Sequence, residues 1–152
     1  MKTYVIAPLL AFLAMPIYAS KMTMPSDAPK SYKVECASCH MAYPPGLLGQ
    51  KNWKSIMTGL DKHFGTDASL DPKTQNEITQ WLIKNAAIKA KYSALAPEDR
   101  ITKTTWFVRK HDEVRADVWK RAGVKSPANC MACHVDAAKG SFDEDSIRIP
   151  AK

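Results

Sequence analysis

The stretches Cys36-Ala37-Ser38-Cys39-His40 and Cys130-Met131-Ala132-Cys133-His134 contain all four cysteines of this 152-residue chain. In each stretch a histidine directly follows a pair of cysteines, which is the spacing of c-type haem attachment. Residues i, i+3 and i+4 share one face of a helical turn, so two sulfurs can form thioethers to haem vinyl groups while the histidine binds the iron. We therefore predict two covalently bound haem c groups. They would be attached to Cys36, Cys39, Cys130 and Cys133, with His40 and His134 as iron ligands.

Three other uses of paired cysteines explain less of the sequence. Zinc sites built from two such pairs usually keep the pairs about 15 to 20 residues apart, whereas Cys36 and Cys130 are 94 positions apart. Disulfides are common in exported chains, and a thioredoxin-like pair accompanies a βαβ pattern that this sequence lacks. None of these alternatives accounts for a histidine after each pair.

Residues 1–19 have the pattern of a secretory signal peptide. Lys2 precedes an apolar stretch from Tyr4 to Met15, and small residues follow at Ala19 and Ser20. About 12 apolar residues are too few to span a bilayer, which takes about 20. We expect residues 1–19 to be removed on export to the periplasm, which leaves a mature chain without a transmembrane segment.

The charge of the chain is basic but not concentrated. The formal net charge of +7 falls to +6 when Lys2 leaves with the signal peptide, and four ionised haem propionates would lower it to about +2. A nucleic-acid binder usually shows a dense basic patch, whereas the Lys and Arg residues here are scattered. Nucleic acid is therefore not an expected partner, and a mildly basic surface better suits an acidic redox partner.

Helical periodicity dominates the rest of the chain and predicts a mainly α fold. After an extended leader at residues 20–31, four helices are expected, each with its own start or stop signals. They are a helix from Trp53 to Phe64, one from an Asp71 N-cap and Pro72 to Ala86 or Tyr92, one from Trp106 towards Gly123, and one that starts at Ser126-Pro127 and holds the second motif. With a linker at residues 94–98, these elements predict a first haem lobe at residues 20–93 and a second at residues 94–152.

The sixth coordination site of each iron separates electron transfer from ligand chemistry, and His or Met can fill it. The chain has four histidines, and the two motifs use two of them, which leaves His63 and His111. Only 18 residues follow His134, and they contain neither His nor Met. The second iron must therefore take a protein ligand from upstream, where His111 is the nearest candidate.

For the first iron, His63 competes with methionine. Met41 follows His40 too closely to cross the ring, and Met57 suits the buried face of its helix equally well, which is the more usual place for such a residue. His63 stands at a helix end just before Gly65, where a side chain can project over a haem. We favour His63 for the first iron and His111 for the second, although a crossed pairing remains open.

Several stretches outside the generic motif are similar to one known family. They are CASCHMAYPPGLL at 36–48, GLDKHFG at 59–65, ASLDP at 68–72, ITKTTWF at 101–107 and FDEDSIRIP at 142–150. Over nearly the whole mature chain the sequence resembles the small bacterial dihaem cytochrome c group called DHC.

The resemblance implies a class I cytochrome c-like first lobe and a smaller, less regular second lobe. It also implies two low-spin bis-His haems, with His40 and His63 on one iron and His111 and His134 on the other. The implied role is that of a periplasmic electron carrier. Its implied partners are a small mono-haem c-type cytochrome and a membrane electron donor.

An iron with two protein ligands does not readily bind a small molecule, so the sequence predicts one-electron transfer rather than an enzyme. Two histidines should also give a lower reduction potential than a His and Met pair. The alternative is a haem enzyme or gas-binding protein with one open iron, which would follow if His63 or His111 were only structural. Dihaem peroxidases are much longer chains, which counts against that alternative.

Overall fold

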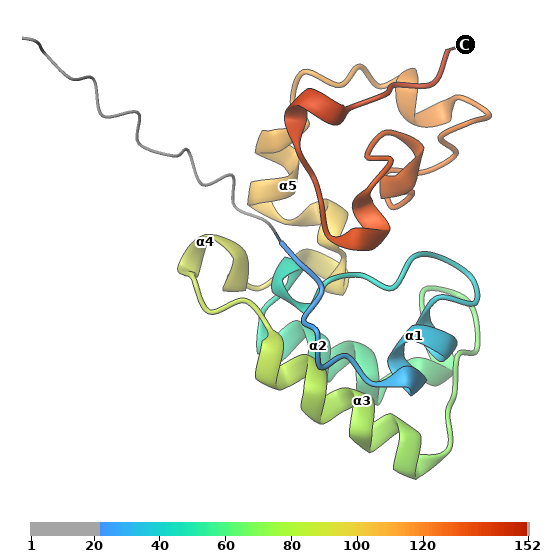
Figure 1. Cartoon of the computed structure of the whole chain (residues 1–152), viewed down its shortest axis with the longest axis vertical. Helices are drawn as coiled ribbons and strands as arrows, with labels where there is room; N and C mark the ends of the chain where they lie inside the picture. Colours follow the sequence, from blue (N-terminus) through green and yellow to red (C-terminus); the bar gives the residue numbers. More distant parts are fainter. Residues whose placement is uncertain (1–21, 152) are drawn as a thin grey trace, which may run out of the picture.

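The computed structural model describes residues 22–151 (Figure 1), so the predicted signal peptide at residues 1–19 lies outside the described residues. Between residues 22 and 151 the chain forms helices and turns, with isolated β-bridges in place of strands. The predicted mainly α fold is confirmed. In the same range, none of the helices combines the length and the apolar character needed to cross a bilayer.

The helices are short, and most of the segments between and after them contain 3₁₀ turns. The α-helices are α1 (Lys30–Cys36), α2 (Gln50–Thr58), α3 (Pro72–Asn85), α4 (Ala90–Ser93) and α5 (Thr105–Lys110). The 3₁₀ turns are Pro45–Leu47, Leu60–Lys62, Pro97–Asp99, Ile101–Lys103, Val118–Lys120, Cys130–Ala132, Ala137–Lys139 and Glu144–Ser146. From α5 to the C-terminal end of the described chain, only 3₁₀ turns interrupt the loops.

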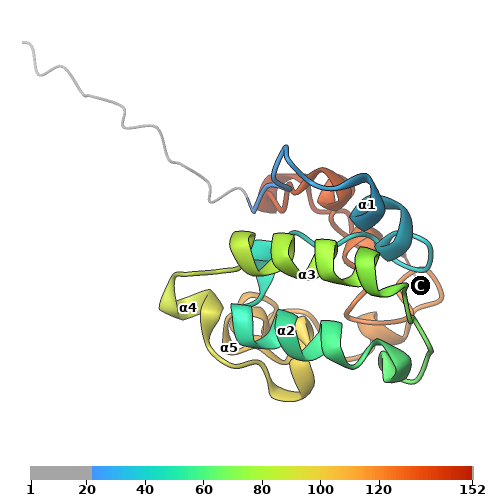
Figure 2. The same cartoon turned by 90° about the horizontal axis from the view of Figure 1, so that it is seen from below.

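The main hydrophobic core lies between α1, α2 and α3. Figure 1 shows these three helices together in the lower half of the view, with α5 and the C-terminal segment above them, and Figure 2 shows α2 and α3 side by side. Burial of apolar side chains at this contact is the main force that holds the helices together. The core cluster is Tyr32, Leu48, Trp53, Met57, Leu60, Ile78, Trp81, Leu82, Ala86 and Ala96.

Helix α3 forms where its capping residues predict it. The Asp71 carboxylate accepts hydrogen bonds from the backbone N–H groups of Lys73 and Thr74, each at 3.1 Å, and Pro72 occupies the first turn, where a missing N–H costs nothing. The helix ends at Asn85, because Ala86 has extended backbone with φ −62° and ψ 160°. Of the two predicted ends, the structure has the earlier one.

Helix α2 ends earlier than predicted, at Thr58 rather than at Phe64. The Thr58 hydroxyl donates to the carbonyls of Lys54 and Ser55 at 3.0 Å, and Gly59, a poor helix former, follows as the C-cap. Both features favour termination. His63 therefore lies in a separate loop after the 3₁₀ turn Leu60–Lys62 and not on α2.

Two helix predictions in the C-terminal half are wrong. Helix α5 ends at Lys110 instead of running towards Gly123, and the acidic pair Asp112 and Glu113 that follows is unfavourable beside the negative end of a helix. No α-helix starts at Ser126-Pro127 either, because the Ser126 hydroxyl accepts from Ala128 N at 3.1 Å and closes a turn.

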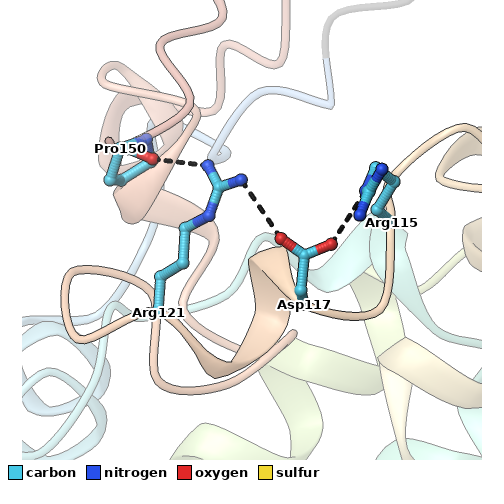
Figure 3. A network of polar contacts seen from close by, with 4 residues as sticks. All are labelled: Arg115, Asp117, Arg121 and Pro150. Carbon is cyan, nitrogen blue, oxygen red and sulfur yellow. Dashed lines mark hydrogen bonds and ion pairs between the residues drawn. The ribbon is translucent and has the colours of Figure 1, made fainter. Parts of the chain in front are cut away.

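The C-terminal segment is fixed by polar contacts that its sequence did not indicate. Figure 3 shows Arg121, which donates to the Pro150 carbonyl at 2.7 Å and to Asp117 at 3.4 Å, while Arg115 binds Asp117 at 2.9 Å. The backbone N–H of Arg148 donates to the Cys133 carbonyl at 2.9 Å. The segment is therefore tied to the second cysteine motif and does not extend freely into solvent.

Candidate functional site

The first motif begins in a helix and continues in a turn. Cys36 is the last residue of α1, and the backbone turns at Ala37 with φ −94° and ψ 1°. The prediction of a full helical turn therefore holds only for the first cysteine. His40 is exposed, and its Nδ1 lies 2.7 Å from the Met41 carbonyl oxygen.

His63 lies across from His40, although 23 positions separate them in the sequence. The two ring centroids are 6.2 Å apart with an interplanar angle of 27°. The loop turns directly after His63, where Phe64 has φ +51° and Gly65 has φ +101°. Arg100 packs over the Phe64 ring at 4.4 Å and holds this loop from the outside.

The pKa of His63 is lowered, first by partial burial and then by the nearby His40 and Arg100. Burial disfavours the charged imidazolium. The neutral form is the one that can bind a metal through a ring nitrogen. The environment of His63 therefore keeps its imidazole in a metal-binding state near neutral pH.

The second motif folds as a 3₁₀ turn, Cys130–Ala132, and not in an α-helix. The backbone N–H of His134 donates to the Cys130 carbonyl at 2.8 Å, which keeps the histidine beside its two cysteines. Burial, and then the nearby His111, lowers the pKa of His134. The Phe142 ring packs against the His134 ring at 5.5 Å.

His111 caps the C-terminal end of α5 and faces His134. Their ring centroids are 6.1 Å apart, and the ring planes are nearly perpendicular at 80°. The orientation of His111 is set by its own helix, because its Nδ1 lies 2.9 Å from the Phe107 carbonyl oxygen and its ring stacks on Phe107 at 4.0 Å. Such a contact to the second ring nitrogen fixes which nitrogen is free for a metal.

Both histidine pairs have the spacing of ligands on opposite sides of one metal ion. Nitrogens about 2.0 Å from a metal on each side separate two coaxial ring centroids by about 6.3 Å. The observed separations are 6.2 Å and 6.1 Å. The structure thus brings the His40 ring close to the His63 ring and the His111 ring close to the His134 ring. The family resemblance implies this arrangement, whereas the positions of the histidines along the chain left it open.

The surroundings of the pairs also fit a bound haem. The Nδ1 atom of His134 and the Nε1 atom of Trp106 are buried without a hydrogen-bond partner in the described structure. Near the histidines, the large apolar side chains of Phe64, Met131 and Val135 are exposed. A flat apolar macrocycle would cover such side chains, which otherwise face water. Within residues 22–151, no group of three or more His, Cys, Asp or Glu side chains gathers closely enough to hold a bare metal ion.

No disulfide joins any two of the four cysteines. Burial raises the pKa of Cys36 to about 11, with Glu35 adding to the effect, and burial also raises the pKa of Cys130 to about 11. The pKa of Cys133 is raised for the same reason. Burial therefore favours an uncharged sulfur at Cys36, Cys130 and Cys133, and a thioether sulfur is uncharged.

The competing methionine Met57 lies in the hydrophobic core with 3% of its surface exposed. It packs among the buried residues of α2 and α3, whereas His63 faces His40. The packing role that the helix periodicity allowed for Met57 is the one observed.

Sequence reasoning missed the aromatic contacts to the histidines. Tyr43 stacks on His40 with ring centroids 4.8 Å apart and an angle of 26°, and Phe107 and Phe142 contact His111 and His134. For Phe107 a signal existed, because residues i and i+4 of a helix are neighbours. For Phe142, eight positions after His134 in a loop, no sequence rule would have indicated the contact.

Comparison with known proteins gives a consistent result. The sequence model of the family described as dihaem cytochrome c matches residues 32–142. A search of curated sequences gave no match.

Solved structures similar to this chain come from two bacteria. The diheme cytochrome type c of Shewanella baltica OS155 is 39% identical, with a TM-score of 0.71, and the match covers 82% of this chain and 96% of that one. A crystal structure of DHC from Rhodobacter sphaeroides is 41% identical, with a TM-score of 0.67 and coverage of 78% and 99%. A further structure of diheme cytochrome c from the same organism is 37% identical, with a TM-score of 0.69 and coverage of 79% and 99%.

Proposed function

Because the chain belongs to the dihaem cytochrome c family, which carries two covalently attached haem c groups and transfers electrons through them, we propose that it is a periplasmic electron carrier with two bis-His irons. His40 and His63 would bind one iron, and His111 and His134 the other. Cys36 and Cys39 would attach the first haem, and Cys130 and Cys133 the second.

The observation that carries this proposal is the separation of the histidine rings, 6.2 Å in one pair and 6.1 Å in the other. A bound haem supplies an iron that changes oxidation state by one electron. His40 with His63, and His111 with His134, would hold the two irons and so exclude other ligands. Packing of Phe107 on His111 and of Tyr43 on His40 restrains the rings, which limits reorganisation when the charge of the iron changes.

Residues 20–93 and 94–152 are proposed as the two haem lobes, the first of them class I cytochrome c-like. The core cluster around α2 and α3 supports a compact first lobe, although it also takes in Ala96. Residues 1–19 are proposed as the signal peptide that directs the chain to the periplasm. A mildly basic surface supports docking to a small acidic mono-haem c-type cytochrome as acceptor, with a membrane electron donor upstream.

Spectroscopy of the purified holoprotein tests the proposal. We expect the ferric protein to be wholly low-spin and the reduced protein not to bind carbon monoxide, because each iron would have two protein ligands. A high-spin ferric fraction or a carbon monoxide complex would instead indicate an open iron. It would favour the alternative of a haem enzyme or gas-binding protein. A far-red band from Met bound to ferric iron would contradict the ligation of His63.

A further inference from the structure

Tyr43 contacts both cysteine motifs. It lies three positions after His40 and stacks on that ring, with centroids 4.8 Å apart. Its hydroxyl donates a hydrogen bond of 2.7 Å to the carbonyl oxygen of Ala128, which is 85 positions further along the chain. One side chain therefore joins the first histidine pair to the backbone that leads into the second motif.

The Ala128 carbonyl oxygen is also an acceptor for the second motif. The backbone N–H of Cys130 donates to it at 3.0 Å, so the Tyr43 hydroxyl and the Cys130 amide meet at a single oxygen. From the His40 ring, the connection to Cys130 runs through one aromatic contact and two hydrogen bonds. No flexible side chain lies within it.

The backbone of Tyr43 is fixed from the opposite side. The buried Tyr32, with 2% of its surface exposed, donates its hydroxyl hydrogen to the Tyr43 carbonyl. Tyr32 packs on Trp81 of α3 with ring centroids 4.6 Å apart. Movement of Tyr43 would disturb this part of the core, so its ring and hydroxyl are held where they are by the packing of α1 against α3.

We propose that Tyr43 is a positioning residue that holds the second haem-attachment motif against the first haem site and thereby sets the rate of electron exchange between the two irons. The exchange role rests on the proposed function. In each exchange one ferrous iron loses one electron and the other, ferric, iron gains it. Tyr43 itself is neither oxidised nor deprotonated.

Three holoprotein variants separate the parts of this role. Tyr43→Phe keeps the ring and removes the hydrogen bond, while Tyr43→Leu removes both. Tyr92→Phe is the matched control, since Tyr92 lies outside both motifs and packs edge-on against Trp106 at 5.5 Å.

Amide hydrogen exchange measures the positioning. In Tyr43→Phe, the amides of residues 130–134 should exchange about 5- to 10-fold faster than in the wild type, because one hydrogen bond that resists local opening is lost. The amides of α3 should be unaffected, and Tyr92→Phe should match the wild type. Unchanged exchange at residues 130–134 would overturn the proposal.

The electron exchange rate, measured by NMR on half-reduced protein, separates this role from a purely structural one. It should fall in Tyr43→Phe while both irons remain low-spin, whereas a purely structural tyrosine would lower stability and leave the rate unchanged. Tyr43→Leu should in addition alter the spectrum of the His40 haem.

The two proposals fail in different ways. A wild-type protein without two low-spin irons would refute the proposed function and the exchange role together. An unchanged rate in a Tyr43→Phe protein that keeps two low-spin irons would refute the role of Tyr43 alone.

Discussion

Replacement of Asn52 by leucine should destabilise the protein. Asn52 lies in α2 with none of its surface exposed. Its amide donates to the Ala96 carbonyl at 3.2 Å and to Asp99 at 2.6 Å, and its Oδ1 accepts from Ala96 N at 3.1 Å. These bonds fix the segment that leaves the core and leads to α5.

The expected loss follows from the backbone group that Asn52→Leu would leave without a partner. Ala96 is 3% exposed, so water cannot readily replace the bond to its N–H group, whereas its carbonyl oxygen keeps the hydrogen bond from Asp99 N at 3.1 Å. An unsatisfied buried group costs about 1–3 kcal/mol, so Asn52→Leu should lower the free energy of unfolding by about 1–3 kcal/mol. The Asp99 carboxylate adds little, because it keeps the Ser55 hydroxyl at 2.7 Å and is partly exposed.

Guanidinium unfolding of the holoprotein, followed by far-ultraviolet circular dichroism, measures this change. Thermal unfolding should show a Tm that is lower by about 3–12 °C. The matched control is Lys51→Ala, one position earlier on the exposed side of α2, which should stay within about 0.5 kcal/mol of the wild type. A loss below about 1 kcal/mol in Asn52→Leu would refute the reasoning, since it would mean that Ala96 finds other partners.

Four further predictions concern the proposed iron ligands, the angles between their rings, the glycine after His63 and the N-cap of α3. His63→Ala and His111→Ala should each open one iron, so that each reduced variant binds about one carbon monoxide per protein in an absorption titration. A variant that still does not bind carbon monoxide would exclude the replaced histidine as a ligand. The ferric wild type should give two low-spin electron paramagnetic resonance signals. The more anisotropic signal should come from the His111–His134 pair at 80° and the other from the His40–His63 pair at 27°, because perpendicular imidazoles leave two iron d orbitals nearly equal in energy. Two identical signals would contradict these ring angles. Gly65→Ala should lower the free energy of unfolding by about 1–3 kcal/mol in denaturant titration, because Gly65 has φ +101°. Gly46→Ala, which is also in open space but has no positive φ, should be close to neutral. Equal losses in the two variants would rule out backbone strain as the cause. Hydrogen bonding to Thr74 holds the pKa of Asp71 below its usual value. The contribution of the Asp71 carboxylate to stability is therefore present above the unfolded-state pKa and lost as the pH falls through the lower folded-state pKa. The stability difference between wild type and Asp71→Asn should shrink in acid, and a pH-independent difference would argue against this role of the carboxylate.

The chemistry of the site could be predicted from the sequence because it depends on local spacing. Cysteines three positions apart and a following histidine are close in almost any compact backbone conformation. The prediction of haem attachment therefore did not depend on the helical turn assumed for it, and Cys130–Ala132 forms a 3₁₀ turn instead. The α3 prediction depended on Asp71 and Pro72, whose effects are equally local.

The failed prediction of a long helix after Trp106 rested on apolar residues with helical spacing. The pattern from Trp106 to Trp119 suggested one long helix, but α5 ends at Lys110. Beyond it, Val118 is buried and Trp119 lies 5.9 Å from His111, ring to ring. Apolar residues in this half gather around the histidine pair rather than along one helix face, and periodicity cannot distinguish these cases.

The sequence by itself determined the two attachment motifs, the inventory of four histidines, the mainly α class and the family. Apart from what the family resemblance implies for the histidine pairs, only the tertiary structure decided which histidine faces which, that Met57 packs in the core, and that Tyr43 reaches Ala128. The physical reason is distance along the chain. Spacing and capping act within a few residues, whereas the His111–His134 pair and the Tyr43 hydrogen bond join segments 23 and 85 positions apart. Such contacts form only through the packing of the whole chain.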